Sequence, residues 1–118
     1  MTPTARTLKF LRDAGYTVAI VERWNPHARI RQDLFGFADL LAMRGRELLA
    51  VQATSTANVS ARVKKILAEP RARLWVEPGS QRFIVVVGWA KRGARGKRKT
   101  WTVKEVPVDA EMFEDSER

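Results

Sequence analysis

The 118-residue sequence predicts an α/β fold of the α+β type, in which a mixed central β-sheet is flanked by helices. Segments with apolar residues at helical spacing alternate with short runs rich in β-branched residues, in the order α-β-β-β-α-β-β. Two of these runs are hydrophobic along nearly their whole length, which is typical of central strands covered on both faces. This order favours a sheet with helices on its faces over an all-β barrel.

The first half of the chain predicts a helix, a strand, a polar loop and a β-hairpin. Thr2 or Thr4 can cap the helix, and Gly15 can end it. The hairpin consists of FGFADLLAM and ELLAVQAT, which are separated by Arg44-Gly45-Arg46. In chain order, the helix, the strand, the loop and the two hairpin strands occupy residues 2–15, 16–23, 25–33, 35–43 and 47–54.

The second half predicts one further helix and two further strands. The helix spans residues 59–69 and is halted by Pro70. A short apolar segment, Leu74-Trp75-Val76, follows it. The strands lie at residues 82–90 and 99–108, with a basic loop between them.

These elements predict a single domain over residues 1–108, followed by an acidic tail. Residues 109–118 (DAEMFEDSER) contain five acidic residues and one arginine, so we expect this tail to be flexible. An acidic tail can also fold back over a basic surface and compete with a bound polyanion.

The composition excludes several kinds of site and favours a polyanionic partner. Without cysteine the chain cannot form disulfides, thiolate zinc sites or a cysteine nucleophile, and one histidine cannot form a multi-histidine metal cage. No apolar run is long enough to span a membrane, so we expect a soluble, cytoplasmic protein. The net charge of +9 favours nucleic acid as the partner, over a charge that serves only solubility.

Polar residues occupy three positions where stability alone favours valine or isoleucine. Asp39 lies in one apolar hairpin strand, and Gln52 and Thr54 lie two residues apart on the other, so their side chains share a face. The short turn places Asp39 opposite that polar pair. These side chains predict a functional site or a structural network, in which Asp39 forms an ion pair and the other two bond across the sheet. The candidate ion-pair partners are Arg29, Arg31 and Arg62.

This stretch resembles the PD-(D/E)XK nuclease superfamily, and within it the archaeal-type Holliday-junction resolvases and the VRR-NUC-like domains, including small phage-encoded members. Phe37-Ala38-Asp39 is similar to the Pro-Asp stretch of the family, and Gln52-Ala53-Thr54 is similar to its Glu-x-Lys stretch. The order of elements matches the restriction-endonuclease-like αβββαβ core. The sequence departs from the motif at Gln52, where the family has a carboxylate, and at Thr54, where it has the lysine.

The resemblance implies hydrolysis of a DNA phosphodiester by water that one or two Mg²⁺ or Mn²⁺ ions activate. It implies that Asp39 is a metal ligand. Asp33 is the candidate second carboxylate, because Gly36 can bend the chain so that both acids face one pocket; capping of a local turn is the alternative role. Gln52 can offer a neutral amide oxygen as a poorer ligand, and Glu22 is a weaker candidate.

The missing lysine of the motif has two candidate replacements on the second helix. Lys64 and Lys65 lie close in sequence to Thr54, and either can supply the positive charge; ordinary solvated lysines on an exposed helix face are the alternative. The candidate catalytic residues are Asp39, Gln52, Thr54, Asp33 and Lys64.

The run KRGARGKRK at residues 91–99 holds six lysines and arginines in nine residues. A flexible basic finger of this kind is suited to a phosphate backbone, and its binding should depend on salt; a solvated loop without a partner is the alternative. Trp24 is the candidate for contact with unpaired bases, whereas core packing is expected for most other tryptophans. The expected nucleic-acid contacts are Arg29, Arg31, Lys65, Lys91, Arg92, Arg95, Lys97, Arg98 and Lys99.

The leading hypothesis is a metal-dependent DNA endonuclease that acts on branched or junction DNA. The alternative is a non-catalytic DNA-binding or architectural module on a nuclease scaffold that has lost its Glu and Lys. An RNA-binding or protein-inhibitor module is a third hypothesis, which only the charge favours. Resolvase-like relatives act as homodimers. The apolar residues that can supply either a dimer face or core are Phe83, Val85, Val87 and Trp89.

Overall fold

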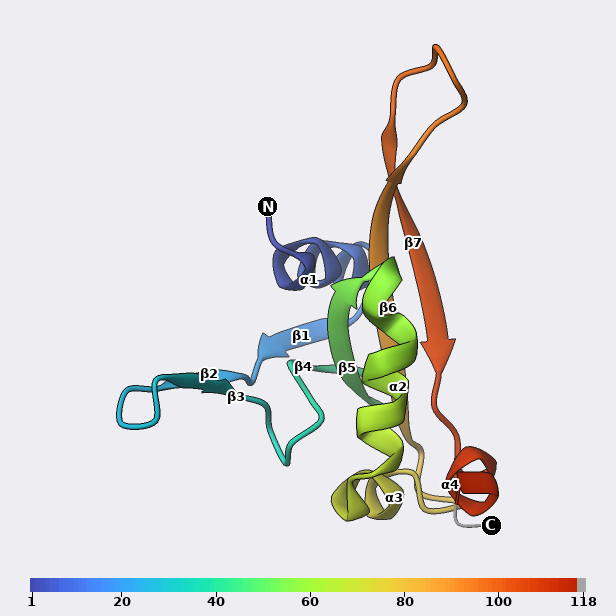
Figure 1. Cartoon of the computed structure of the whole chain (residues 1–118). Helices are drawn as coiled ribbons and strands as arrows, with labels where there is room; N and C mark the ends of the chain where they lie inside the picture. The colour runs from blue at the N-terminus through green and yellow to red at the C-terminus, as the bar shows by residue number, and fades with distance from the viewer. Residues whose placement is uncertain (117–118) are drawn as a thin grey trace.

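A five-stranded sheet forms the centre of the protein in the computed structural model, which describes residues 1–116, with the side chains of residues 1–114. The strands are β1 (Thr17–Ile20), β4 (Leu40–Arg44), β5 (Glu47–Ser55), β6 (Arg82–Arg92) and β7 (Thr100–Pro107). Their order is β1-β4-β5-β6-β7, and every neighbouring pair is antiparallel except β5 and β6, which are parallel (Figure 1). The predicted mixed central sheet is therefore confirmed.

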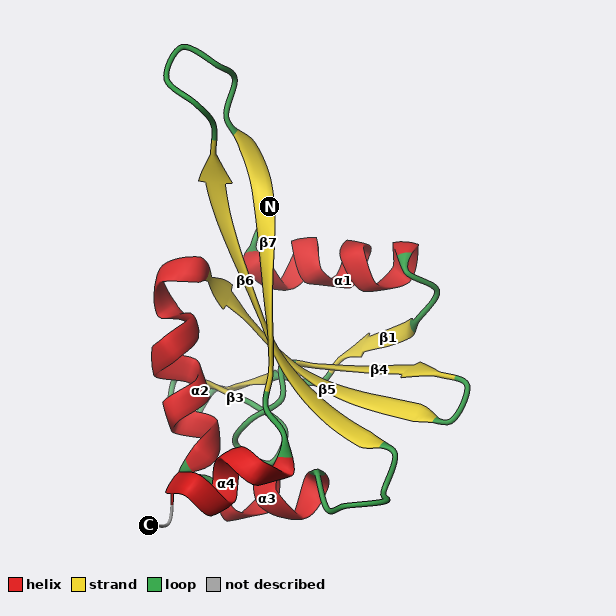
Figure 2. Cartoon of the chain, turned by 90° about the vertical axis from the view of Figure 1, so that its right-hand side faces the viewer, coloured by secondary structure: helices red, strands yellow, loops and turns green. Residues whose placement is uncertain are grey.

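Helices cover both faces of this sheet (Figure 2). They are α1 (Pro3–Asp13), α2 (Val59–Leu67), α3 (Pro70–Trp75) and α4 (Ala110–Ser116), with a 3₁₀ turn, η1 (Thr56–Asn58), before α2. Leu11 of α1 joins a buried cluster on one face, and Ile66, Ala72 and Phe113 of the other three helices join a cluster on the opposite face. Within the described residues no helix is both long and apolar enough to cross a membrane.

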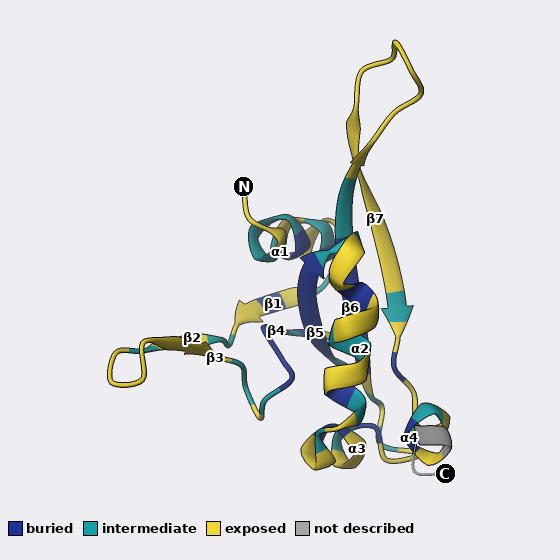
Figure 3. Cartoon of the chain, viewed as in Figure 1, coloured by how far each residue is buried: buried dark blue, intermediate teal, exposed yellow. Residues whose placement is uncertain are grey.

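The central position of β5 explains why its segment is hydrophobic throughout. Side chains alternate between the two faces of a strand, so Val51 and Ala53 pack beneath α1 while Ala50 packs beneath α2. Figure 3 shows that β5 is buried along most of its length. The polar residues Gln52 and Thr54 therefore lie inside the protein.

The order of the main elements agrees with the sequence. When a small side hairpin is set aside, the sheet strands and the two longest helices follow the order α1-β1-β4-β5-α2-β6. This is the expected αβββαβ order, and β7 extends the sheet beyond it. The parallel pair β5 and β6 needs a crossover connection, which α2 and α3 supply.

The strand predicted over residues 16–23 is shorter than expected. β1 ends at Ile20, because the N–H groups of Val21 and Glu22 both donate to the carbonyl oxygen of Asp39 and leave the regular ladder. The chain turns away from the sheet at this point.

A second sheet of two strands lies where the sequence predicted a polar loop, so the loop prediction at residues 25–33 is wrong. β2 (Arg23–Asn25) and β3 (Ile30–Gln32) pair antiparallel and project from the body of the protein (Figure 1). The side chain of Asn25 closes the turn between them, since it accepts hydrogen bonds from the backbone N–H groups of His27 and Ala28.

Two of the helices were not predicted. Pro70, expected only to halt a helix, also begins α3, and the Glu69 side chain caps it by accepting from the N–H of Arg71. The acidic segment that we expected to be a flexible tail forms α4 as far as Ser116, with Phe113 buried in the core. Residues 117–118 lie outside the described part of the chain.

Candidate functional site

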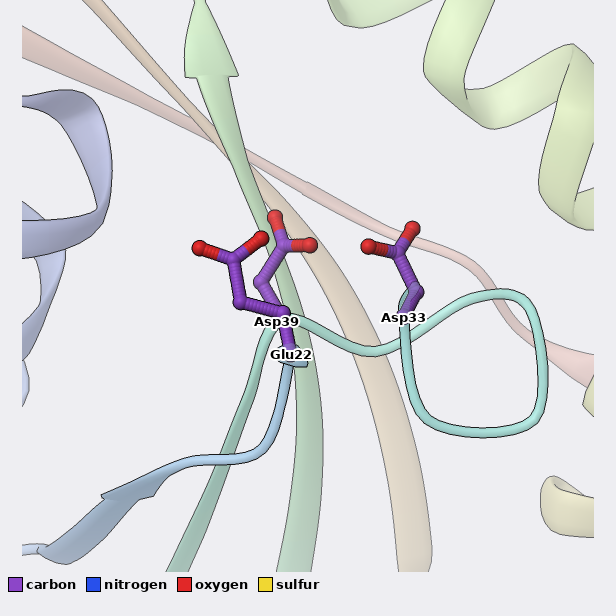
Figure 4. Close-up of side chains that lie close together, drawn as sticks. All are labelled: Glu22, Asp33 and Asp39. Atoms are coloured by element: carbon purple, nitrogen blue, oxygen red, sulfur yellow. The ribbon is translucent and has the colours of Figure 1, made fainter. Parts of the chain in front are cut away.

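Three carboxylates meet at the corner of the sheet where β1 ends and β4 begins. Glu22 follows β1, Asp33 follows β3 and Asp39 precedes β4. One oxygen atom of each carboxylate lies within 4.8 Å of the others. Figure 4 shows Asp33 facing the other two acids from a neighbouring loop. We call these three residues the carboxylate corner. It contains Asp33 and Asp39, the predicted pair of metal ligands, together with Glu22, which the sequence offered as a weaker candidate ligand.

The loop that joins Asp33 to Asp39 brings them together. The sequence predicted a strand over residues 35–39, but the chain reverses there, and the N–H of Gly36 donates to the Asp33 carbonyl at 3.2 Å. Gly36 has a φ of +79°, and a Cβ at this position would lie 2.7 Å from Oε1 of Glu69. The strand prediction for these residues is wrong, whereas the expected bend at Gly36 is confirmed.

Asp39 is the most buried acid of the corner, with 4% of its surface exposed. Its Oδ2 accepts a hydrogen bond from the backbone N–H of Ala53 at 2.9 Å, and its Oδ1 accepts from Nε2 of Gln52 at 3.3 Å. The pairing of Leu40 with Val51 places Asp39 opposite Gln52, as the hairpin predicted. The carboxylate thus continues the contact between β4 and β5 after the backbone ladder ends.

Gln52 holds the two aspartates in position. Its Nε2 also donates to Oδ2 of Asp33 at 3.0 Å and to the carbonyl of Phe37 at 3.1 Å. Its Oε1, the atom that the sequence offered as a metal ligand, accepts from Nη1 of Arg62 at 2.8 Å. In this arrangement Gln52 positions the carboxylates, and Glu22 supplies the third acidic group of the corner.

The two aspartates differ in their affinity for a proton. Burial raises the pKa of Asp39 to about 8, and the hydrogen bond with Asp33 and the negative charges of Asp33 and Glu22 act in the same direction. Burial also opposes ionisation of Asp33, yet hydrogen bonds from Asp39 and Gln52 and the charge of Lys65 lower its pKa. Asp39 therefore keeps its proton to a higher pH than Asp33 does.

Positive side chains surround the corner. Nζ of Lys65 lies 3.4 Å from Oδ2 of Asp33, and Nη1 of Arg31 lies 3.5 Å from Oε1 of Glu22. These cations, with Arg62 and others, line an open cleft of about 1180 Å³ bounded by α1, the start of β2 and α2. Two of the arginines that could have paired with Asp39 thus contact other members of the site.

Three predicted catalytic residues do not line this cleft, and of these only Gln52 contacts the aspartates of the corner. Thr54 is buried on β5, two residues beyond Gln52, and does not line the cleft. Lys64 is exposed on α2 and does not line it either, whereas its neighbour Lys65 does. Of the two lysines, Lys65 is the one that places positive charge beside the carboxylates, in addition to Arg31.

The basic run forms the tip of a long hairpin that projects from the sheet (Figure 1). We call residues 91–99 the basic arm, and all its lysines and arginines are exposed. At its base, the guanidinium of Arg6 lies 3.6 Å from the ring centre of Trp101, and Nζ of Lys91 lies 5.4 Å from it. Arg29 is exposed at the turn of the β2–β3 hairpin, whereas Arg31 and Lys65 belong to the cleft.

Sequence reasoning gave too little weight to Glu22 and missed the contact of Arg62 with Gln52. Glu22 is the first acid after the apolar run Val18-Ala19-Ile20-Val21, which is the same relation to a strand that drew attention to Asp39. Arg62 was expected only as an ion-pair candidate for Asp39; its contact with Gln52 had no such signal, because only the packing of α2 on the sheet brings the two side chains together.

Comparison with known proteins adds no relative to this picture. No protein-family model, no curated protein and no solved structure matches the chain. The resemblance to the PD-(D/E)XK superfamily rests on the motif positions and the order of elements. The chemistry of the site must accordingly be argued from its own residues.

Proposed function

We propose that this protein is a metal-dependent DNA endonuclease that hydrolyses phosphodiester bonds in the cleft beside the carboxylate corner. The proposal rests above all on the convergence of Glu22, Asp33 and Asp39, whose oxygens lie within 4.8 Å of one another in an open cleft lined by cations. A cluster of acids alone has many explanations. A cluster of acids surrounded by lysine and arginine matches the two needs of phosphodiester chemistry, a cation site and a phosphate site.

The donor set fits a hard divalent cation. Mg²⁺ and Mn²⁺ prefer oxygen ligands and are commonly held by one or two carboxylates together with substrate phosphate. Asp39 and Asp33 would hold such an ion, with Glu22 as the third oxygen donor. Bound there, the ion lowers the pKa of a water molecule and offsets negative charge on the phosphate during hydrolysis.

The protein's own residues would orient the acids and the phosphate. Gln52 fixes both aspartates through its Nε2, and Arg62 fixes Gln52 through its Oε1. Lys65 and Arg31 line the cleft and each contacts a carboxylate of the corner, so they would lie beside a phosphate group bound there. Positioned cations of this kind stabilise the charge that develops on the phosphate oxygens.

The basic arm would bring the DNA to this cleft. Six exposed cations on a projecting hairpin favour contact with a phosphate backbone independent of base sequence. From the resemblance, branched or junction DNA remains the predicted substrate. A homodimer remains the predicted oligomeric state. Access to DNA implies a cytoplasmic location for this function.

A cleavage assay tests the proposal. The purified protein is incubated with labelled duplex, flap and four-way junction DNA in Mg²⁺, Mn²⁺ or chelator. We expect nicking only with a divalent ion, and its loss in Asp39→Asn, which keeps the size of the side chain and one acceptor oxygen for the N–H of Ala53. Absence of cutting on every DNA in both metals, from a sample with a cooperative thermal transition, would exclude the enzymatic function.

A specific observation favours a second candidate, a non-catalytic DNA-binding module. Gln52, rather than a carboxylate, occupies the centre of the site, and its amide satisfies Asp33, Asp39 and Arg62 as a closed hydrogen-bond network. This candidate predicts salt-dependent DNA binding that chelator does not change, and no cutting. Measurements of binding and cutting on the same DNA separate the two functions.

A further inference from the structure

Two aromatic side chains are exposed beside the carboxylate corner. Trp24 on β2 is 57% exposed and Phe35 in the following loop is 48% exposed. Each stands two residues beyond an acid of the corner, Trp24 after Glu22 and Phe35 after Asp33. Neither side chain is needed to fill the core, because the two buried clusters are built from other residues.

The hairpin geometry places Trp24 beside the cleft, on the same face of the β2–β3 ribbon as Arg31, which lines it. Trp24 pairs with Arg31 across the β2–β3 ribbon, and directly opposite residues of an antiparallel pair point to the same face. From that face Arg31 reaches Glu22, at 3.5 Å. Trp24 is therefore on the side of the ribbon that carries a contact to the corner.

Phe35 is held at the cleft by an unusual backbone. It has a φ of +53°, a conformation that favours glycine and is costly for a bulky side chain. With this backbone conformation, the Phe35 side chain lines the cleft instead of packing in the core. A backbone strain that presents an aromatic ring to a cleft is typical of a contact with a ligand.

The positive charge around Trp24 and Phe35 indicates which kind of ligand these rings would bind. Residues 23–32 contain three arginines and no acid, so a surface with exposed rings is embedded in positive charge. The wall of the cleft adds Arg62, Lys65 and Arg71. A partner that offers flat aromatic faces together with negative charge is a nucleic acid with accessible bases. Paired bases in a duplex are stacked on one another and offer no such face.

We propose that Trp24 and Phe35 are stacking platforms for unpaired bases on the strand whose phosphate enters the carboxylate corner. Each ring belongs to a residue only two positions along the chain from an acid of the corner. The stacked bases are therefore those next to the reactive phosphate. The inference rests on the proposed function for the identity of the cleft, and it adds that the cleft takes single-stranded rather than fully paired DNA.

Equilibrium binding in chelator tests the inference without any cutting. The DNA probes are a fluorescein-labelled single strand, a duplex with a short unpaired gap, and the intact duplex. We expect Trp24→Leu and Phe35→Leu each to weaken binding of the single strand and the gapped duplex about tenfold, since base stacking on an aromatic ring is lost. Binding of the intact duplex should change less than twofold, because the basic arm is unchanged.

Phe83→Leu is the matched control. Phe83 is also 48% exposed, but it lines a separate, smaller cavity that shares no lining residue with the cleft. We expect this variant to bind all three DNAs like the parent protein. A gapped duplex with 2-aminopurine in the gap gives a second readout, since stacking on Trp24 should quench its fluorescence in the parent protein and not in Trp24→Leu.

The inference fails if both cleft variants bind the single strand as tightly as the parent, or if they lose affinity for single and double strands equally. It also fails if 2-aminopurine is quenched equally by the parent and by Trp24→Leu. These outcomes are independent of nuclease activity. If the protein stacks bases in chelator but never cuts DNA, the inference holds and the proposed function is wrong. If it cuts DNA without stacking bases, the proposed function holds and the inference is wrong.

Discussion

The carboxylate corner and the basic arm differ in both charge and order. In the corner, Asp39 and Gln52 are buried, and no buried side-chain nitrogen or oxygen in the described part of the chain is without a hydrogen-bond partner. On the arm, every lysine and arginine is exposed on a hairpin that leaves the body of the protein. The first region fixes charged groups to within a few ångströms, and the second presents charge without fixing it.

Under the proposed function, this difference suits the two regions to different tasks. Groups that act on a reacting phosphate must be held in place, as the corner holds its aspartates. A polycation that binds DNA by releasing counterions needs no fixed geometry. Changes in the corner should therefore alter the rate of cutting at unchanged affinity, and changes in the arm should alter affinity at an unchanged rate.

The largest effect is expected from Asp39→Asn. It removes a carboxylate from the proposed metal site and keeps an oxygen that can accept from the N–H of Ala53. We expect the single-turnover rate of cutting in Mg²⁺ to fall about 1000-fold or more, as for the loss of a metal ligand. DNA affinity in chelator, measured by fluorescence anisotropy, should stay within twofold of the parent protein. A parallel fall in affinity would show that the corner also binds the DNA.

The second-largest effect is expected on DNA affinity when charges are removed from the basic arm. Replacing Arg95, Lys97, Arg98 and Lys99 together by serine should weaken DNA binding about 10- to 100-fold at moderate salt. The slope of log K against log salt should fall by about one for each lost phosphate contact. The cutting rate at saturating DNA should not change. The control exchanges lysine and arginine at the same four positions, which keeps the charge; a loss of affinity in that control would contradict a purely electrostatic role.

The third effect compares two adjacent lysines. Lys65→Met removes the cation that lies 3.4 Å from Asp33, so the rate of cutting should fall about tenfold, less than when an enclosed charge-stabilising donor is lost, because Lys65 is exposed. Lys64→Met removes an exposed charge that does not line the cleft and should leave the rate within twofold. Single-turnover assays of both variants make the measurement. Equal effects would mean that only the net charge of α2 matters.

The smallest effect concerns stability and pH. The folded-state pKa of Asp39 is raised to about 8, above the value of about 3.9 in unfolded chains, so the folded protein binds the extra proton between these limits. Its contribution to stability is present at acidic pH and is lost as the pH rises toward 8. In chelator, thermal melts of the parent protein should show a falling Tm from pH 5 to pH 8.5.

Asp39→Asn supplies the control for this pH dependence, because it cannot ionise. At pH 8 the variant should be more stable than the parent by about 1–3 kcal/mol, a Tm difference of several degrees. At pH 5 the two Tm values should converge. Parallel melting curves across the whole pH range would show that Asp39 does not titrate in this window.

The sequence predicted the central sheet well because its signals are local. The continuous apolar runs and the short Arg44-Gly45-Arg46 turn define β4 and β5, and their register follows from the turn. The β2–β3 hairpin was missed because its residues are mostly exposed, including the apolar Trp24 and Ile30, so burial gives them no pattern. The same reasoning failed for α4, where Phe113 buries one face of a segment that is otherwise acidic.

Only part of the site was predicted, because only some of its residues stand out in the local sequence. Asp39 and Gln52 were recognisable because polar residues interrupt apolar strands, and the bend at Gly36 brought in Asp33. The choice between Lys64 and Lys65 depends on the rotation of α2 about its axis, which the sequence does not determine. Lys64 was chosen, but Lys65 is the residue that reaches Asp33.

The central claim is that the carboxylate corner holds a divalent cation, and electron paramagnetic resonance of Mn²⁺ tests it most directly. Titration of the parent protein with Mn²⁺ should remove the six-line signal of the free ion up to one or two equivalents. Asp39→Asn should abolish this binding, and Glu47→Gln, which alters an exposed acid at the far end of β5, should retain it. A free-ion signal undiminished by the parent protein, or equal binding by Asp39→Asn, would contradict the account.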